Sequence, residues 1–249
     1  MFSEIINFVL ISSLVAIQSI AGVGILVVGT PILLFLNITI VETMNYLLPI
    51  SIITSLLNIM IMKFNNNNFY YDINRLKYFF IICIPFVFIG LIILKYSYDI
   101  INYDYIVSSI IILTLVFKKK ISLIIKNLSK TLNKIILMNI GIIHGMTNSG
   151  GTLLSIFLIN LSSLKKEIRS ELSLFYFFLA LIQFIFLYIV FGSQLNIQQY
   201  YFTIIYIIIG VILGNILIKY VKEKQFRGLI FFLALISSIS LILKNLLKF

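Results

Sequence analysis

The sequence predicts an all-α integral membrane protein with about eight hydrophobic helical units in two internal repeats. Three observations predict this fold: an extremely apolar composition, a series of apolar segments of membrane-spanning length, and matching segments in the two halves of the chain. Of the 249 residues, 61% are hydrophobic and only 11% are charged. Because soluble domains carry about 25% charged residues, the composition excludes a soluble protein.

The apolar segments have the length of transmembrane helices. Most contain 17 to 22 residues, and about 20 residues of helix cross the hydrocarbon core of a bilayer. Two segments are longer, and glycine-rich sequence interrupts each of them near its middle. The segments cover approximately residues 5–37, 43–62, 78–94, 100–117, 135–161, 172–191, 197–218 and 228–247.

The second half of the chain matches the first half in the same order of elements, at offsets of 122 to 125 residues. We therefore predict two membrane repeats, residues 1–117 and 135–249. The linker between them, 118–134, contains six lysines and is expected to lie on the cytoplasmic surface. The matching pairs are GLIILKY (90–96) with GNILIKY (214–220), GTPILLF (29–35) with GTLLSIF (151–157), and Asn58 with Gln183.

The distribution of basic residues indicates how the interrupted segments are threaded. If each is a re-entrant hairpin, 16 of the 19 Lys and Arg residues fall on one side of the membrane and 3 on the other. If each crosses once, the division is 11 to 8. Only the hairpin obeys the positive-inside rule strongly. Each repeat then has one broken hairpin followed by three spans, which makes the repeats inverted. The net charge of +11 therefore marks orientation and not a nucleic-acid partner.

The interruption in the second repeat reads HGMTNSGG, residues 144–151. Non-helical backbone inside a membrane is tolerated only where protein buries it or where it lines a wet cavity. We expect Thr152 to cap the helix that follows, because the first N–H groups of a helix have no intrahelical partner and favour anions. Gly150 and Gly151 would let a ligand approach the backbone, and Asn148 and Ser149 would add neutral donors.

The first repeat has a similar interruption, with Gly22, Gly24 and Gly29 before a Thr-Pro pair. We expect Thr30 to be the N-cap and Pro31 to occupy the first helical position, where its missing N–H costs nothing. The two helix N-termini would then point at one central site. The alternative interpretation is that these glycines only pack helices together.

A small anion is the favoured ligand of this site. The eight acidic residues and all Lys and Arg residues are expected outside the middle of the spans, whereas amide N–H and hydroxyl groups can bind an anion without them. His144, the only histidine, could couple a proton to transport, or it could simply donate to a backbone carbonyl; Gly22 is its expected counterpart. Asn58 and Gln183 could line the pathway or form interhelical hydrogen bonds.

The two interruptions, GVGILVVGTPILLF and GMTNSGGTLLSIF, resemble the glycine-rich stretches near the start of each half in the TauE/SafE family of sulfite exporter-like transporters. The first lacks the glycine triplet of that family and the second lacks its proline. The resemblance covers essentially the whole chain. It implies export or import of sulfite, sulfonates or related organosulfur anions across a bacterial plasma membrane.

We therefore expect a multi-pass secondary transporter for a small, sulfur-containing anion. The alternatives are a passive anion channel or a structural membrane subunit. No enzyme activity, cofactor or metal is expected, because the chain has no Walker A sequence, one histidine and one cysteine. The expected partners are the anion and the lipid bilayer, with a homo-oligomer possible.

Overall fold

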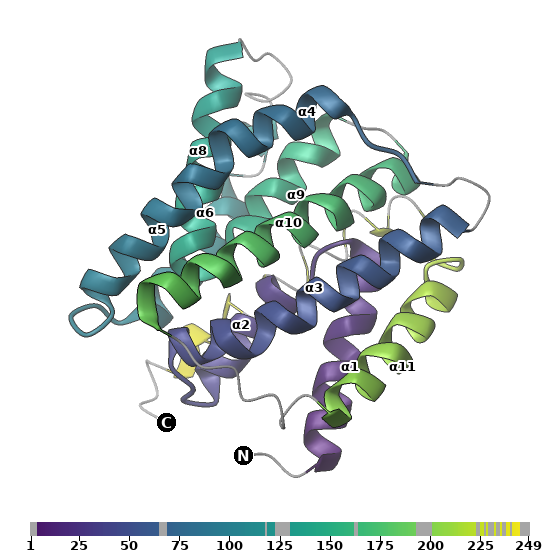
Figure 1. Cartoon of the computed structure of the whole chain (residues 1–249), viewed down its shortest axis with the longest axis horizontal. Helices are drawn as coiled ribbons and strands as arrows, with labels where there is room; N and C mark the ends of the chain where they lie inside the picture. Colours follow the sequence, from purple (N-terminus) through teal and green to yellow (C-terminus); the bar gives the residue numbers. More distant parts are fainter. Residues whose placement is uncertain are drawn as a thin grey trace.

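The regular structure of the described residues is entirely helical, which confirms the predicted all-α class. The computed structural model describes residues 4–64, 69–117, 119–122, 130–161, 164–192, 201–222 and parts of 225–244; residues 118 and 123–129 of the linker lie outside them. The elements, drawn in Figure 1, are α1 (Glu4–Ala21), α2 (Ile25–Phe35), α3 (Ile40–Phe64), α4 (Ile73–Tyr78), the π-helical turn η1 (Phe79–Cys83), α5 (Ile84–Ser97), α6 (Tyr103–Val116), α8 (Lys130–Thr147), α9 (Gly150–Leu161), α10 (Lys165–Phe191) and α11 (Tyr201–Leu217).

Four helical stretches are long and apolar enough to cross a membrane: Glu4–Ala21, Ile40–Phe64, Ile73–Ser97 and Lys165–Phe191. The third stretch joins α4, η1 and α5 into one continuous rod. By contrast, α2 and α9 have only 11 and 12 residues. At 1.5 Å per residue they are about 17 Å long, roughly half of the hydrocarbon thickness.

Both short helices fold back along the helix that precedes them. Gly24 of α2 lies against Gln18 of α1, and Gly29 lies against Leu14, so that α2 runs antiparallel to α1. In the second half, Gly150 at the start of α9 lies against His144 and Ile140 of α8. The interrupted segments are therefore hairpins, as the distribution of basic residues indicated, and not single crossings.

The long helices α3 and α10 pack side by side in opposite directions at the centre of the molecule (Figure 1). Met44, near the start of α3, lies 3.8 Å from the Gln183 amide near the end of α10. Met62, near the end of α3, accepts a hydrogen bond from Ser170 near the start of α10 at 3.6 Å.

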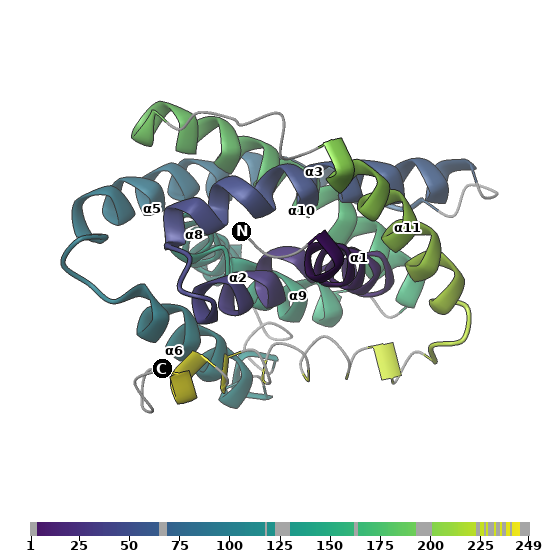
Figure 2. The same cartoon turned by 90° about the horizontal axis from the view of Figure 1, so that it is seen from below.

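The remaining long helices pair across the two halves of the chain. Helix α1 packs on α11, and α8 packs on α5. Figure 1 shows these two pairs on opposite sides of α3 and α10, and in Figure 2 α5 and α8 lie toward the left and α1 and α11 toward the right. This exchange of partners is the arrangement that two-fold-related repeats would produce. It supports the predicted duplication, which remains a prediction.

Glycines allow close approach of the paired helices. Gly141 and Gly145 of α8 lie against the carbonyl groups of Cys83 and Val87, and Gly90 of α5 lies against the carbonyl of Ile142. In the other pair, Gly210 and Gly214 of α11 lie against the carbonyls of Ser12 and Ala16. Small residues serve this packing purpose in membrane helices. The packing interpretation thus holds for these glycines, all of which lie outside the two breaks except Gly145, which follows His144.

We expect Gly90→Ala to destabilise the fold by about 1–3 kcal/mol, the usual cost of overpacking a tight contact. The added methyl group would overlap the Ile142 carbonyl oxygen, which the α8 backbone holds in place. Thermal unfolding of the purified protein would measure the effect. Gly228→Ala is the matched control because its methyl group would meet no heavy atom within 4 Å. Equal unfolding temperatures for both variants would contradict the close-packing argument.

The basic loops gather at one end of the helical bundle. Lys165 donates to the carbonyls of Ile218 at 3.1 Å and Val221 at 2.6 Å, and the contact between Met62 and Ser170 brings the end of α3 to the same place. At the opposite end, Lys95 donates to the Val190 carbonyl at 2.7 Å. This arrangement agrees with basic loops on a single face of the membrane.

Candidate functional site

The two breaks have the same backbone conformation. Gly22 (φ 76°) and Asn148 (φ 59°) both adopt left-handed conformations directly after a helix. The N–H of Gly22 donates to Gln18 O at 2.8 Å, and that of Asn148 donates to His144 O at 2.9 Å. The counterpart of His144 is therefore Gln18, 126 positions earlier. The expected pairing of His144 with Gly22 is wrong, because it aligned the Gly-Thr sequences instead of the points where the backbone turns.

The helices after the breaks begin earlier than predicted. Helix α2 begins at Ile25, after Gly24 at the N-cap, and α9 begins at Gly150. Thr30 and Pro31 therefore lie inside α2, and neither is the N-cap or first helical residue that was expected. Thr152 does not cap α9 either, because its hydroxyl donates to the Ser149 carbonyl at 2.8 Å. The glycines permit the backbone to become helical several residues before each Thr.

At the first break, Gln18 performs the capping role that Thr30 was expected to have. Its Oε1 accepts from the N–H of Ile25, the first residue of α2, at 3.2 Å. Its Nε2 donates to the hydroxyls of Ser51 at 3.2 Å and Ser55 at 3.0 Å. The sequence analysis missed Gln18. An alignment of the two left-handed turns would have found it opposite His144.

At the second break, two buried polar side chains have no partner. Both ring nitrogens of His144 and the hydroxyl of Tyr176 make no hydrogen bond to any described residue, and both side chains are fully buried. Their rings meet edge to face, with centroids 6.2 Å apart. The Tyr176 hydroxyl lies over the first turn of α9, where it would overlap a Cβ atom placed on Gly151. Tyr176 was not identified from the sequence.

Asn148 connects the two halves of this region. Its Nδ2 donates to the Thr30 hydroxyl at 3.2 Å, and its Oδ1 accepts from Gln183 Nε2 at 2.9 Å. Gln183 also donates to His144 O at 3.0 Å. A Cβ on Gly151 would lie 3.0 Å from the side chain of Val27, so the first turns of α2 and α9 are neighbours. The predicted residues Thr30, Asn148 and Gln183 are thus brought together.

The other predicted amide, Asn58, lies at the first break. Its Nδ2 donates to the Ser19 hydroxyl at 3.1 Å, and its Oδ1 accepts from Asn215 at 3.0 Å and Arg169 at 3.4 Å. Arg169 is only 9% exposed. Arg169 follows Lys165 and Lys166 in the chain, yet it does not share the exposure of Lys166. Arg169 is the fifth residue of α10, and its side chain extends inward between α1, α3 and α11.

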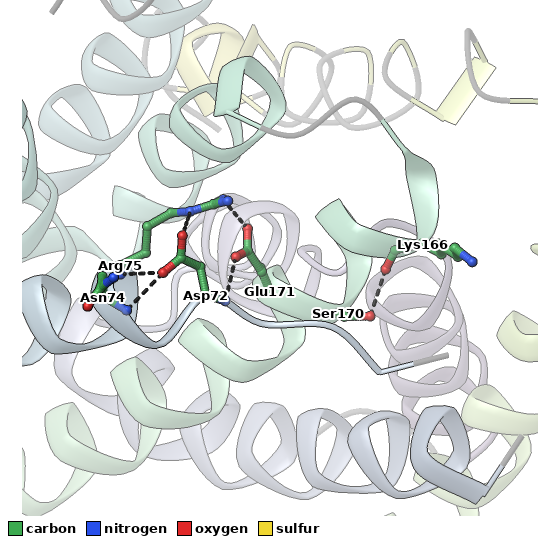
Figure 3. Close-up of polar contacts among 6 residues, drawn as sticks. All are labelled: Asp72, Asn74, Arg75, Lys166, Ser170 and Glu171. Carbon is green, nitrogen blue, oxygen red and sulfur yellow. Dashed lines mark hydrogen bonds and ion pairs between the residues drawn. The ribbon is translucent and has the colours of Figure 1, made fainter. Parts of the chain in front are cut away.

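A second charged residue near the start of α10 is also buried. Glu171 is fully buried and pairs with Arg75 at 2.6 Å (Figure 3). Arg75 also contacts Asp72, which caps α4. Burial alone would raise the pKa of Asp72, but hydrogen bonds from Arg75 and Asn74 lower the pKa overall. These ion pairs join α4 to α10 at the basic end of the bundle.

A cavity of about 270 Å³ lies at the same end, between α4, α8, α9 and α10. Its lining is largely apolar and includes Phe175, Leu154 and Leu137, with Arg75 as its charged residue. The unpaired Oδ1 of Asn133 is buried beside it. Phe175 precedes Tyr176 in the chain, and Leu154 lies within one turn of Gly151 on α9. The cavity therefore extends from the basic end toward the second break.

The described residues contain no group of three or more His, Cys, Asp or Glu side chains that could hold a metal ion. A model of the sulfite exporter TauE/SafE family matches residues 8–241, nearly the whole chain. No curated protein and no solved structure was found to match it.

Proposed function

The chain belongs to the sulfite exporter TauE/SafE family, and we propose that it is a secondary transporter of a small sulfur-containing anion, such as sulfite or a sulfonate. The anion would bind at the start of α9, between the two breaks, and would cross the plasma membrane by alternating access. Membership of this family supports the transport of a sulfur-containing anion, and the geometry of the breaks supports the binding residues and the mechanism.

One observation carries this proposal: the Tyr176 hydroxyl and the His144 ring are buried at the first turn of α9 and make no hydrogen bond to any residue that the structure describes. Buried polar groups in proteins almost always have partners, and leaving one unsatisfied costs about 1–3 kcal/mol. A helix N-terminus favours negative charge. An anion there could accept a hydrogen bond from Tyr176 and from the N–H groups of the helix.

The difference between the breaks supports a site at α9. In α2, the Gln18 side chain already accepts from the first N–H group. In α9, no side chain of the described residues accepts from the N–H groups of Gly150 or Gly151. His144 replaces Gln18 at the equivalent position, and Tyr176 replaces Ser51. Gln18 and Ser51 hydrogen-bond to each other at the first break, whereas His144 and Tyr176 do not do so at the second break.

The charge of the basic end suits an anion. Lys63, Lys77, Lys165, Lys166 and Lys219 lie at or near this end, and a basic surface raises the local concentration of anions. The cavity beside Arg75 would form part of the route between this surface and the second break. Opening of that route would require movement of α4 or α9.

The test is uptake by the purified protein in liposomes. Labelled sulfite and methanesulfonate are the substrates, with chloride, phosphate and sodium as controls. We expect saturable, selective uptake of the sulfur oxyanions. Uptake that rises linearly with concentration would indicate a channel instead. If folded protein moved none of these anions, the proposed function would be wrong.

His144→Gln should remove the pH dependence of uptake while leaving transport itself measurable. Glutamine occupies the equivalent position in the first repeat and cannot take up a proton, whereas an imidazole can do so once the route opens and water reaches it. Methanesulfonate uptake should be measured from about pH 5 to pH 8, because this substrate stays charged throughout that range. The same pH profile in wild type and variant would place proton coupling elsewhere.

A further inference from the structure

We propose that Arg169 provides a second anion-binding position, next to the first break and on the basic side of the α9 site. This inference rests on the proposed function and extends it: the anion would occupy two positions in sequence. The position at Arg169 has the permanent positive charge of a guanidinium group. The position at α9 has the neutral donors of Tyr176 and the start of the helix.

All the partners of Arg169 are neutral. Its Nε donates to the backbone carbonyl of Ser19 at 2.7 Å. Its Nη2 donates to Asn215 Oδ1 at 2.7 Å and to Asn58 Oδ1 at 3.4 Å. Among the described residues, no carboxylate lies within ion-pair distance, and Nη1 makes no hydrogen bond. The buried cation therefore lacks a counter-ion in the part of the chain that the structure describes.

A charge in this position is costly. Charged side chains within membrane segments are rare and usually pair with one another, or mark the path of a substrate or ion. Glu171, two residues further along α10, is paired with the opposite charge of Arg75. Arg169 has no such pair among the described residues, which leaves the path of a substrate as its role. An anionic substrate would supply the missing negative charge.

A purely structural role explains only part of the arrangement. A cation near the C-terminus of α1 is favoured by the helix dipole, and the bond to Ser19 O has this effect. However, the equivalent of Arg169 in the first repeat, 125 positions earlier, is Met44 of α3. Met44 lies beside Gln183, just as Arg169 lies beside Asn58. The end of α8 is thus built without a cation, so the fold does not require one at the end of α1.

The shape of the guanidinium group predicts which anions bind. Its planar fork of N–H donors matches two oxygens of a carboxylate or another oxyanion. The two N–H groups of Nη1 can donate to the oxygens of such a group while Nε stays on Ser19. We therefore expect Arg169 to favour sulfite and sulfonates over chloride, which offers a single atom.

Equilibrium binding of labelled sulfite, with unlabelled chloride as competitor, tests this inference. Arg169→Met should weaken sulfite binding roughly 10- to 100-fold, the value of hydrogen bonds to a charged group. Lys95→Met is the control. It removes the same charge from an exposed side chain at the opposite end of the bundle, and it should bind like wild type.

Arg169→Lys separates charge from shape and covers the case in which Arg169→Met does not fold. Lysine keeps the charge near Ser19 and loses the fork, so we expect weaker sulfite binding and less discrimination against chloride. Wild-type affinity and selectivity in Arg169→Lys, or in folded Arg169→Met, would overturn the inference and leave Arg169 a structural residue. If the wild-type protein itself bound no sulfite, the proposed function would fail, which is a different outcome.

Discussion

Gly151→Ala should reduce sulfur-anion uptake by more than tenfold, although it adds only one methyl group. The Tyr176 hydroxyl occupies the place of a Cβ on Gly151. The methyl group must displace either the tyrosine or the first turn of α9. Overpacking of this kind costs about 1–3 kcal/mol in stability, and a shift of about 1 Å in positioned donors can reduce activity far more. Initial rates of uptake in liposomes, corrected for the amount of folded protein, measure the effect.

Gly228→Ala is again the control, because its added methyl group would meet no heavy atom within 4 Å. A second comparison is Gly210→Ala, whose added methyl group would overlap the Ser12 carbonyl in the α1–α11 pair and should lower stability without touching the second break. If Gly151→Ala transported at the wild-type rate, the close approach of Tyr176 to α9 would have no functional meaning. The glycine would then only serve helix packing.

Tyr176→Phe should change anion binding and protein stability in opposite directions. It removes the hydroxyl and keeps the ring, which packs edge to face on His144. If the hydroxyl donates to an anion, its loss should weaken binding about 10- to 100-fold. In the absence of anion the variant should be as stable as wild type, or more stable by about 1 kcal/mol, because an unsatisfied buried hydroxyl has been removed.

Thermal unfolding with and without saturating sulfite measures both effects in one experiment. Wild type should gain stability from the anion, and Tyr176→Phe should gain much less at the same concentration. Lower stability of the variant without anion, combined with an unchanged gain from sulfite, would show that the hydroxyl serves the fold and not the ligand.

Much of the architecture follows from the sequence because membrane helices are constrained by length and charge. Apolar segments of about 20 residues predict spans. The concentration of Lys and Arg in particular loops predicted that α2 and α9 fold back. The hairpins, the central position of the breaks and the neighbouring first turns of α2 and α9 all agree with that reasoning.

The details of the site did not follow from the sequence. The Gly-Thr pairs suggested that Thr30 and Thr152 begin helices, yet glycine allows a helix to start earlier, and only the left-handed turns at Gly22 and Asn148 reveal the correct register. Tyr176 sits in a run of aromatic residues that looks entirely lipid-facing. Arg169 follows two lysines at a helix start, where a cation normally faces water. Their burial depends on tertiary packing, which periodicity alone does not record.

The most direct test of the central claim is to locate a bound anion in an experimental structure. Selenite, a heavier analogue of sulfite, would be identified by its anomalous scattering in crystals of the protein. We predict a selenium position beside the first turn of α9, within hydrogen-bond reach of the Tyr176 hydroxyl, with Arg169 as a second position. A selenium atom bound only at surface lysines, or none at a concentration that saturates uptake, would contradict the claim that the breaks form the anion site.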